Sequence, residues 1–226
     1  KIMDSFNVPI YELDGFEADD LVGTLSKQAN KLNMDSLIVT GDADQLQLVD
    51  DRTRVLMYTG FGNSRVYDDS AVKDRYDGLG PEYIAEIKAL EGDPSDNIPG
   101  VPGIGKKTAR ILLNSLGHFE SLYANTSEIP EIPSLRGASR IQEIIEKNKE
   151  VAYDSLKLTT IVRTAPISLD FDKSEFGNYD RNMIVRTLSQ LEFRSIVRQI
   201  PESPEVASAI KSSGNSVTKK SAENVN

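Results

Sequence analysis

Residues 89–110, ALEGDPSDNIPGVPGIGKKTAR, decide the fold because they join an acidic turn to a glycine-rich turn that opens a helix. The glycines of GVPGIG, residues 100–105, permit positive φ angles and close backbone approach. The run KKTAR, residues 106–110, is typical of first helical turns. Free N–H groups and positive charge favour a phosphate ligand here, since no Asp or Glu lies between Val101 and His118. The stretch predicts a docking point for nucleic-acid phosphates, which does not read bases.

Two carboxylates, Asp93 and Asp96, lie just before this turn. Asp in a Pro-Ser-Asp-Asn context is commonly a turn or capping residue, and Gly and Pro also crowd into ordinary loops. Taken alone, this stretch therefore leaves a purely structural interpretation open.

Composition limits the chemistry. The chain has 226 residues, enough for one α/β domain with an appended helical part. It has no cysteine, which fits a reducing compartment and excludes thiolate-bound zinc, and its single histidine, His118, argues against an imidazole site. The formal net charge of -9 is the wrong sign for coating nucleic acid. Bound cations could cancel part of that charge locally.

The sequence also bears on location. No apolar run approaches the roughly 18 to 20 residues of a membrane span, and Lys1–Ile10 is not a signal peptide. We expect a cytoplasmic protein without a membrane partner. The chain starts without Met and runs directly into a strand-like segment, residues 9–13, so we expect it to begin inside a domain.

Hydrophobic spacing predicts strands followed by helices. Residues 18–32 have helical periodicity, SLIVT at 36–40 is typical of a buried parallel strand, and 54–58 with 64–67 indicate a hairpin. Further helices are expected at 43–49, 71–76, 81–90, 106–116, 119–123, 138–148, 151–162, 181–191 and 194–200. The serine-rich tail, residues 201–226, is expected to be disordered or a linker.

Two more acidic groups follow predicted strands: Glu17, Asp19 and Asp20, then Asp42 and Asp44. Carboxyl ends of strands in an open α/β sheet border one crevice, so these acids can converge there. One helical face cannot present the first group, which favours a late helix start with Asp19 or Asp20 as N-cap. The alternative is that acids simply favour helix N-termini.

A carboxylate cluster is costly unless cations neutralise it, and ligands that are all oxygen suit Mg²⁺ or Mn²⁺. Two such ions can activate a water and stabilise a leaving oxygen in phosphodiester hydrolysis. A metal cluster beside a phosphate-docking turn therefore indicates a nuclease.

Three motifs then carry a resemblance: GFEADDLVGTLSKQA (15–29), VTGDADQLQLV (39–49) and LEGDPSDNIPGVPGIGKKTA (90–109). In this order they resemble the 5′ nuclease superfamily, in particular the 5′→3′ exonuclease domains of bacterial DNA polymerase I, with flap endonucleases as more distant relatives. LEFRSIV (191–197) is similar as well.

The resemblance implies a PIN-like (Rossmann-like) α/β fold with a mostly parallel sheet, followed by a helical region with a helix-hairpin-helix-like motif. It implies three parts: residues 1–80 as part of the PIN-like domain, 81–200 as the helical region, and 201–226 as the tail. The implied substrate is duplex DNA with a 5′ end or flap, cut in replication and repair. A polymerase domain is expected beyond Asn226.

The resemblance also implies site residues. The metal-site acids are Glu17, Asp19, Asp20, Asp42, Asp44, Asp93 and Asp96, with catalytic roles for Asp42, Asp44 and Asp96. Two Mg²⁺ or Mn²⁺ ions are expected there, and a K⁺ ion at the hairpin. The DNA-binding residues are Gly100, Val101, Gly103, Ile104, Gly105, Lys106, Lys107, Thr108 and Arg110.

The chain departs from the family at its front. Family members have a first strand with acidic ligands and a basic arch before the region that matches Lys1. We therefore expect lost sheet pairing and exposed apolar surface. Two hypotheses remain: a metal-dependent 5′ nuclease, or a catalytically silent duplex-binding module. An acidic metal-binding protein unrelated to DNA would not explain the glycine-rich turn.

Overall fold

The computed structural model describes residues 1–60, 62–175, 177 and 179–201, which form two compact units. The larger unit is Leu13–Ser168, and the smaller combines Lys1–Glu12 with residues from Leu169 onward. Every predicted site residue belongs to the larger unit. The predicted linker, apart from Pro201, lies outside the described residues.

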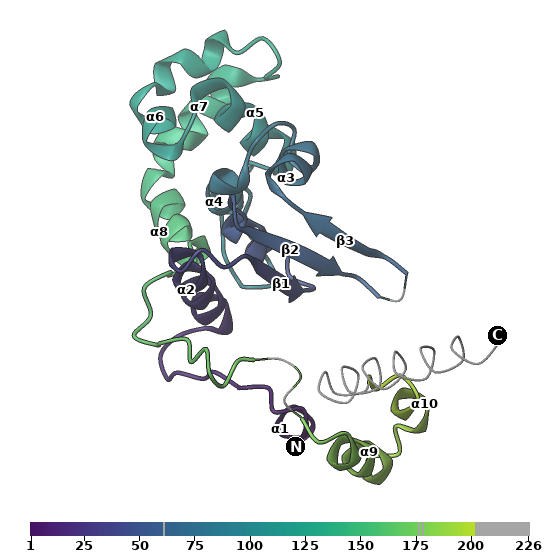
Figure 1. The fold of residues 1–226 in the computed structure, drawn as a ribbon. Coiled ribbons are helices and arrows are strands. Elements are labelled where there is room, and N and C mark those ends of the chain that lie inside the picture. The colour runs from purple at the N-terminus through teal and green to yellow at the C-terminus, as the bar shows by residue number, and fades with distance from the viewer. Residues whose placement is uncertain (61, 176, 178, 202–226) are drawn as a thin grey trace, which may run out of the picture. The chain divides into compact units, whose positions relative to one another are not determined.

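The larger unit contains one mixed sheet of strands β1 (Ser36–Thr40), β2 (Thr53–Tyr58) and β3 (Ser64–Tyr67). The strand order is β1-β2-β3, with β1 parallel to β2 and β3 antiparallel to β2 (Figure 1). The predicted parallel strand at residues 36–40 and the predicted hairpin are confirmed, but the expected burial of that strand is wrong, because only Ile38 of β1 is buried. The hairpin makes one of the two strand pairings antiparallel, because two adjacent strands joined by a short turn must run in opposite directions.

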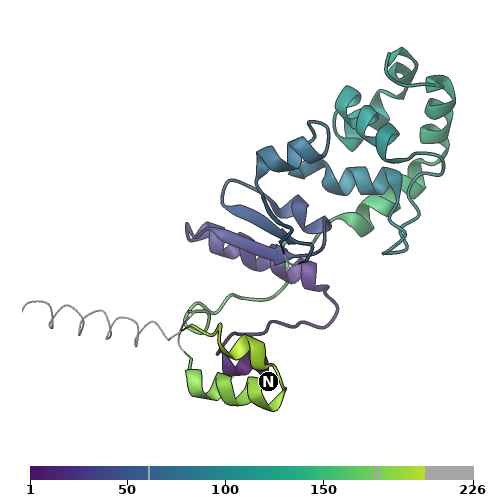
Figure 2. The same ribbon diagram turned by 90° about the vertical axis from the view of Figure 1, so that its right-hand side faces the viewer.

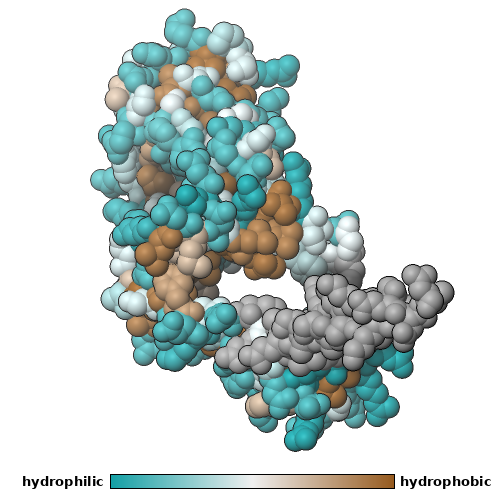
Figure 3. All heavy atoms as spheres, in the orientation of Figure 1, coloured by the Kyte–Doolittle hydropathy of each residue, from teal (hydrophilic) through white to brown (hydrophobic). Residues whose placement is uncertain are grey.

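The two faces of this sheet differ in burial. Ile38, Val55 and Met57 point into the main core. On the other face large apolar side chains are exposed to solvent: Leu37 (56%), Val39 (64%), Tyr58 (46%) and Val66 (48%). Figure 3 shows hydrophobic residues gathered over the sheet. The expected exposure of apolar surface is confirmed.

Helices make up most of the larger unit. They are α2 (Ala18–Lys31), η1 (Asp44–Leu48), α3 (Asp69–Arg75), η2 (Pro81–Tyr83), α4 (Ile84–Glu91), α5 (Lys106–Leu116), α6 (Phe119–Ala124), η3 (Thr126–Glu131), α7 (Ala138–Lys147) and α8 (Lys149–Thr159). In Figure 2 the teal helices, which include α5, α6 and α7, gather at one end of the sheet. A single core runs from Ile38 in β1 to Ala152 in α8, so the sheet and the helices share one interior.

The smaller unit contains α1 (Ile2–Ser5), α9 (Arg181–Gln190) and α10 (Arg194–Val197). The predicted strand at residues 9–13 is wrong, because this segment pairs with no strand. Its Tyr11 hydroxyl instead accepts a hydrogen bond from the Asp170 backbone N–H at 3.0 Å. Extended backbone without a partner strand forms no sheet, whatever its propensity.

The helices that the structure describes include none long and apolar enough to cross a membrane.

Candidate active site

A cleft of about 380 Å³ collects six of the seven predicted acids. They come from the start of α2, the turn after β1 and the loop after α4, and they are Glu17, Asp19, Asp20, Asp42, Asp44 and Asp96. The far wall is the end of α8 and the residues after it, 158–161. Segments distant in sequence therefore meet in one acidic cleft.

The first acidic group begins α2 differently from the prediction. Glu17 is the N-cap, and neither Asp19 nor Asp20 takes that position. The Glu17 backbone N–H donates to Asp20 Oδ2 at 3.2 Å, which forms a capping box. The other oxygen, Asp20 Oδ1, accepts a hydrogen bond from the Val162 backbone N–H at 2.8 Å. Asp20 therefore also fastens the chain after α8 to the start of α2.

Asp19 faces the other acids. Burial raises the pKa of its carboxyl, a hydrogen bond with the Gln45 side chain opposes this, and the charges of Asp42, Asp20 and Asp96 raise it further. The negative charge of Asp19 is therefore costly in the protein alone. A cation in the cleft would relieve that cost.

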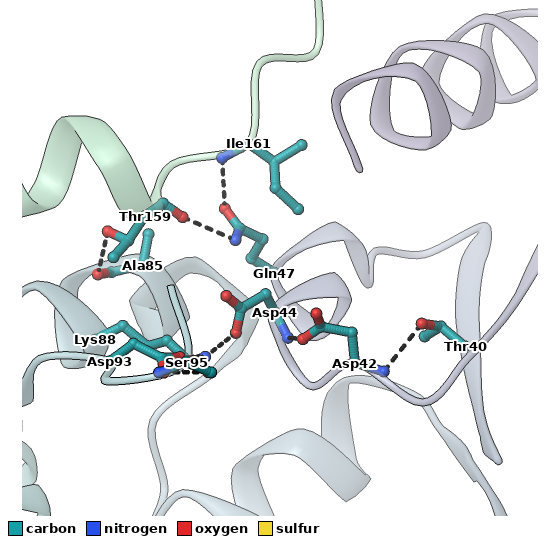
Figure 4. Close-up of polar contacts among 10 residues, drawn as sticks. All are labelled: Thr40, Asp42, Asp44, Gln47, Ala85, Lys88, Asp93, Ser95, Thr159 and Ile161. Carbon is teal, nitrogen blue, oxygen red and sulfur yellow. Dashed lines mark hydrogen bonds and ion pairs between the residues drawn. The ribbon is translucent and has the colours of Figure 1, made fainter. Parts of the chain in front are cut away.

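Asp42 and Asp44 are placed by a tight turn after β1. The Asp42 backbone N–H donates to Thr40 Oγ1 at 3.0 Å, and the Asp44 backbone N–H donates to Asp42 Oδ1 at 2.9 Å. These bonds fix the two acids where strand β1 ends and η1 begins (Figure 4). The Asp44 side chain is only 14% exposed, and burial raises the pKa of its carboxyl.

A lysine that sequence reasoning missed lies against this cluster. Lys88, on α4, forms ion pairs with both Asp44 and Asp93 (Figure 4). Its side chain is 17% exposed. Burial alone would lower its pKa, but hydrogen bonds to the two carboxylates outweigh burial and raise the pKa above the usual range. Lys88 therefore stays charged and partly neutralises the acids.

Asp93 lies in the loop after α4 and is not among the residues that line the cleft. Hydrogen bonds from Lys88 and Ser95 hold the pKa of Asp93 at about 2. Its backbone N–H and C=O exchange hydrogen bonds with Ile98 at 2.9 and 2.8 Å. Asp93 therefore both closes the acidic loop and brings an ionised carboxylate to the cluster.

Asp44, Asp93 and Asp96 fit a divalent cation. Each offers one carboxylate oxygen, and these atoms all lie within 4.8 Å of one another. A donor set of oxygens alone suits hard cations such as Mg²⁺ and Mn²⁺. A cation at this place would share Asp44 and Asp93 with the ammonium of Lys88.

The far wall of the cleft depends on a glutamine that sequence reasoning did not single out. Gln47, in η1, donates from Nε2 to the Thr159 carbonyl at 3.1 Å and accepts from the Ile161 backbone N–H at 3.0 Å. Thr159 Oγ1 in turn donates to the Ala85 carbonyl at 2.9 Å, as Figure 4 shows. These bonds hold the end of α8 against the acidic loops.

The predicted phosphate-docking turn, residues 100–105, is exposed only in part. Gly103, with φ +88°, and Gly105 are exposed, so their backbone is accessible to a ligand. Gly100 is buried. The side chains of Val101 (2% exposed) and Ile104 (3%) pack in the core and anchor the turn, so only their backbone could meet a ligand.

The basic residues of α5 also divide. Lys106, Lys107 and Thr108 occupy the first turn, where both lysines are exposed. Arg110 is committed elsewhere: its Nη1 lies 3.0 Å from Asp77 Oδ2, and its guanidinium lies over the Tyr76 ring. Its side chain is 21% exposed.

The chain also matches known proteins. Residues 1–77 match a family model described as 5′-3′ exonuclease, N-terminal resolvase-like domain, and residues 79–182 match one described as 5′-3′ exonuclease, C-terminal SAM fold. DNA polymerase I of Chloroflexus aurantiacus is 40% identical over 212 residues, which cover 92% of this chain and 22% of that protein. The chain thus spans about a fifth of such relatives.

Solved structures support the fold. The T5 D15 protein co-crystallised with metal ions has a TM-score of 0.56 at 23% identity, covering 68% of this chain and 54% of that one. The catalytic core of Rad2 in complex with DNA has a TM-score of 0.52 at 16% identity, covering 84% and 61%. The predicted α/β domain with a following helical region is confirmed.

Proposed function

The chain belongs to the 5′-3′ exonuclease family, and we propose that it is a metal-dependent nuclease that hydrolyses duplex DNA at 5′ ends and flaps. The observation that carries this proposal is the cleft that gathers acids from three segments of the chain, together with the cluster of Asp44, Asp93 and Asp96, whose carboxylate oxygens could share one cation. We further propose that the chain acts in replication and repair in the bacterial cytoplasm at the nucleoid, followed in the complete protein by a polymerase domain.

We assign Asp42, Asp44 and Asp96 to catalysis and all seven predicted acids to the metal site. Bound Mg²⁺ or Mn²⁺, as two ions, would activate a water and stabilise the leaving oxygen. The chain's own groups prepare this site: Gln45 orients Asp19, and Ser95 orients Asp93 through its backbone N–H at 2.9 Å. Asp20, tied to two backbone N–H groups, mainly supports the site by position.

The glycine-rich turn and the first turn of α5 would bind the phosphates of uncut duplex. Exposed backbone at Gly103 and Gly105 supports this assignment, as do the exposed side chains of Lys106 and Lys107. We also propose the K⁺ ion of the hairpin, held by backbone carbonyls. These contacts would hold the duplex while the acidic cleft meets the strand to be cut.

The test is cleavage of a 5′-labelled flap duplex with Mg²⁺ and with EDTA. The parent chain should yield a product only with Mg²⁺, and Asp42→Ala combined with Asp96→Ala should abolish it. The matched control is Asp74→Ala combined with Glu143→Ala, which removes two exposed acids outside the cleft. Equal cleavage by both double variants would refute the assignment.

A second candidate is a duplex-binding module that does not cut. The specific observation in its favour is Lys88, which already provides a positive charge to Asp44 and Asp93. It predicts salt-sensitive binding that Lys106→Glu with Lys107→Glu weakens, and no product with Mg²⁺.

A further inference from the structure

A second cleft, which is basic and not acidic, is formed in part by the first turn of α5. It has a volume of about 320 Å³ and is lined by Lys107, Thr108, Ile111, Ser134, Leu135 and Arg136. Three of these residues belong to α5 and three to the loop before α7, so two segments distant in sequence form it. We call it the Arg136 cleft.

The loop that carries Arg136 is held firmly against the turn. Ile132 and Leu135 are each only 8% exposed and belong to the main core. On the other side, a Cβ on Gly103 would lie 3.6 Å from Ile144 Cδ1, which places α7 next to the docking turn. Figure 1 shows α5 and α7 in the same group of helices. Arg136 therefore has a fixed base close to Lys107.

The two charged side chains of this cleft are unpaired in the described part of the chain. Neither Lys107 nor Arg136 has an ion-pair or hydrogen-bond partner within the described part of the chain, in contrast to Arg110 with its Asp77 partner. No acid occurs at residues 97–119 or 132–142. In a chain of net charge -9, two acid-free segments that meet at one cleft make a local positive site.

The polar groups of the cleft suit a phosphate diester. Two cations can pair with its negative charge, and the hydroxyls of Thr108 and Ser134 can donate to its oxygens. The apolar side chains of Ile111 and Leu135 complete the lining and offer no competing acceptor. If Lys107 and Arg136 were merely solvated surface charges, there would be no reason for two hydroxyl groups to line the same cleft with them.

We propose that the Arg136 cleft binds a second backbone phosphate of duplex DNA, so that residues 134–136 extend the contact made by the docking turn. The proposal rests on the proposed DNA-binding function. It adds a chain segment outside the glycine-rich motif to the proposed contacts with DNA. The contact would position the duplex without reading its sequence.

The experiment measures the affinity of the whole chain for a fluorescent duplex in EDTA, by anisotropy, over a series of KCl concentrations. Arg136→Gln should weaken binding several-fold and lower the slope of log affinity against log salt by about one, because one phosphate contact is lost. Arg136→Lys should restore most of the slope. Lys31→Gln, the same charge change at the exposed end of α2, should leave the slope unchanged.

Each other outcome is decisive. If Arg136→Gln binds like the parent while Lys106→Glu with Lys107→Glu does not, the cleft is no subsite, although the proposed function stands. If Lys31→Gln acts as strongly as Arg136→Gln, only overall charge matters and the cleft is again refuted. Equal competition by inorganic phosphate or poly-glutamate would assign the cleft to another anion. If the parent chain does not bind duplex, the proposed function itself fails.

Discussion

Gly92 and Gly100 pack backbone to backbone, so closely that a Cβ on Gly100 would lie 2.5 Å from the Gly92 Cα. This contact joins the end of α4, where the acidic loop begins, to the start of the phosphate-docking turn. A hydrogen bond from the Val101 N–H to the Leu90 carbonyl, at 2.9 Å, runs beside it. The acidic loop and the phosphate-docking turn, both within residues 89–110, are therefore packed directly against each other.

We predict that Gly100→Ala destabilises the protein by more than about 2 kcal/mol, since the methyl group meets backbone and φ is +60°. Gly105→Ala is the matched control, because nothing lies within 4 Å of its Cβ and its φ is -105°. Urea unfolding of the two variants checks this. Equal midpoints would show that the Gly92 contact can relax.

For Asp19 we predict a substitution that stabilises the protein. Its pKa is raised, by burial first and then by neighbouring acids, so its ionised form costs stability above that pKa and the cost falls away at lower pH. Asp19→Asn should therefore raise the Tm by a few degrees at neutral pH in EDTA. The rise in Tm on adding Mg²⁺ should be smaller than in the parent, because a proposed ligand is gone.

Asp50→Asn is the control for this experiment. Burial alone would raise the pKa of Asp50, but hydrogen bonds from Arg52 and Thr53 outweigh it and hold the pKa below the usual range. Removing this carboxylate should lower the Tm, with or without Mg²⁺. A lower Tm for Asp19→Asn as well would mean that Asp19 serves the fold and not the cleft.

Much of this arrangement could be predicted from residue type and spacing. Helix α5 begins and ends where its glycines indicate, at Lys106 and before Gly117, because both boundaries are local chemistry. Glu17, Asp19 and Asp20 lie in the cleft without a strand before them, but the placing of Asp42 and Asp44 there followed from the predicted strand at residues 36–40. The start of α2 did not, because the capping box of Glu17 and Asp20 satisfies the same N–H groups that an aspartate N-cap would.

Partners distant in sequence could not be predicted. Nothing local connects Gln47 to Thr159, 112 residues further along, although their hydrogen bond shapes the cleft. Lys88 gave a weak signal, as a lone cation between the buried Ile87 and Ala89 on α4. Only the tertiary fold shows that it meets Asp44.

Lys88→Met should destabilise the protein, because it removes this pairing. Two mostly buried carboxylates, on Asp44 and Asp93, would lose their cation, which typically destabilises by about 3 kcal/mol. Mg²⁺ should recover part of this loss by supplying another cation, so the Tm gain on adding Mg²⁺ should exceed that of the parent. Calorimetry with Mg²⁺ and with EDTA measures both effects.

The control for Lys88 is Lys73→Met, because Lys73 pairs with Asp69 on the surface, where ion pairs contribute little. Its Tm should stay close to that of the parent. If Lys88→Met showed no greater response to Mg²⁺ than the parent, the lysine and the metal would not share these carboxylates.

The depressed pKa of Asp93 gives the last prediction. Its ionised form stabilises the fold above the ordinary pKa of 3.8, and this contribution is lost as the pH falls through about 2. The difference corresponds to about 2 kcal/mol, since the side chain is only 12% exposed. Asp93→Asn should be less stable than the parent at pH 5, and the gap in free energy of unfolding should close towards pH 2. Asp154→Asn, which removes an exposed carboxylate paired with Lys157, should follow the parent throughout. A gap that stays constant with pH would mean that Asp93 stabilises the loop through the packing of its side chain and not through its negative charge.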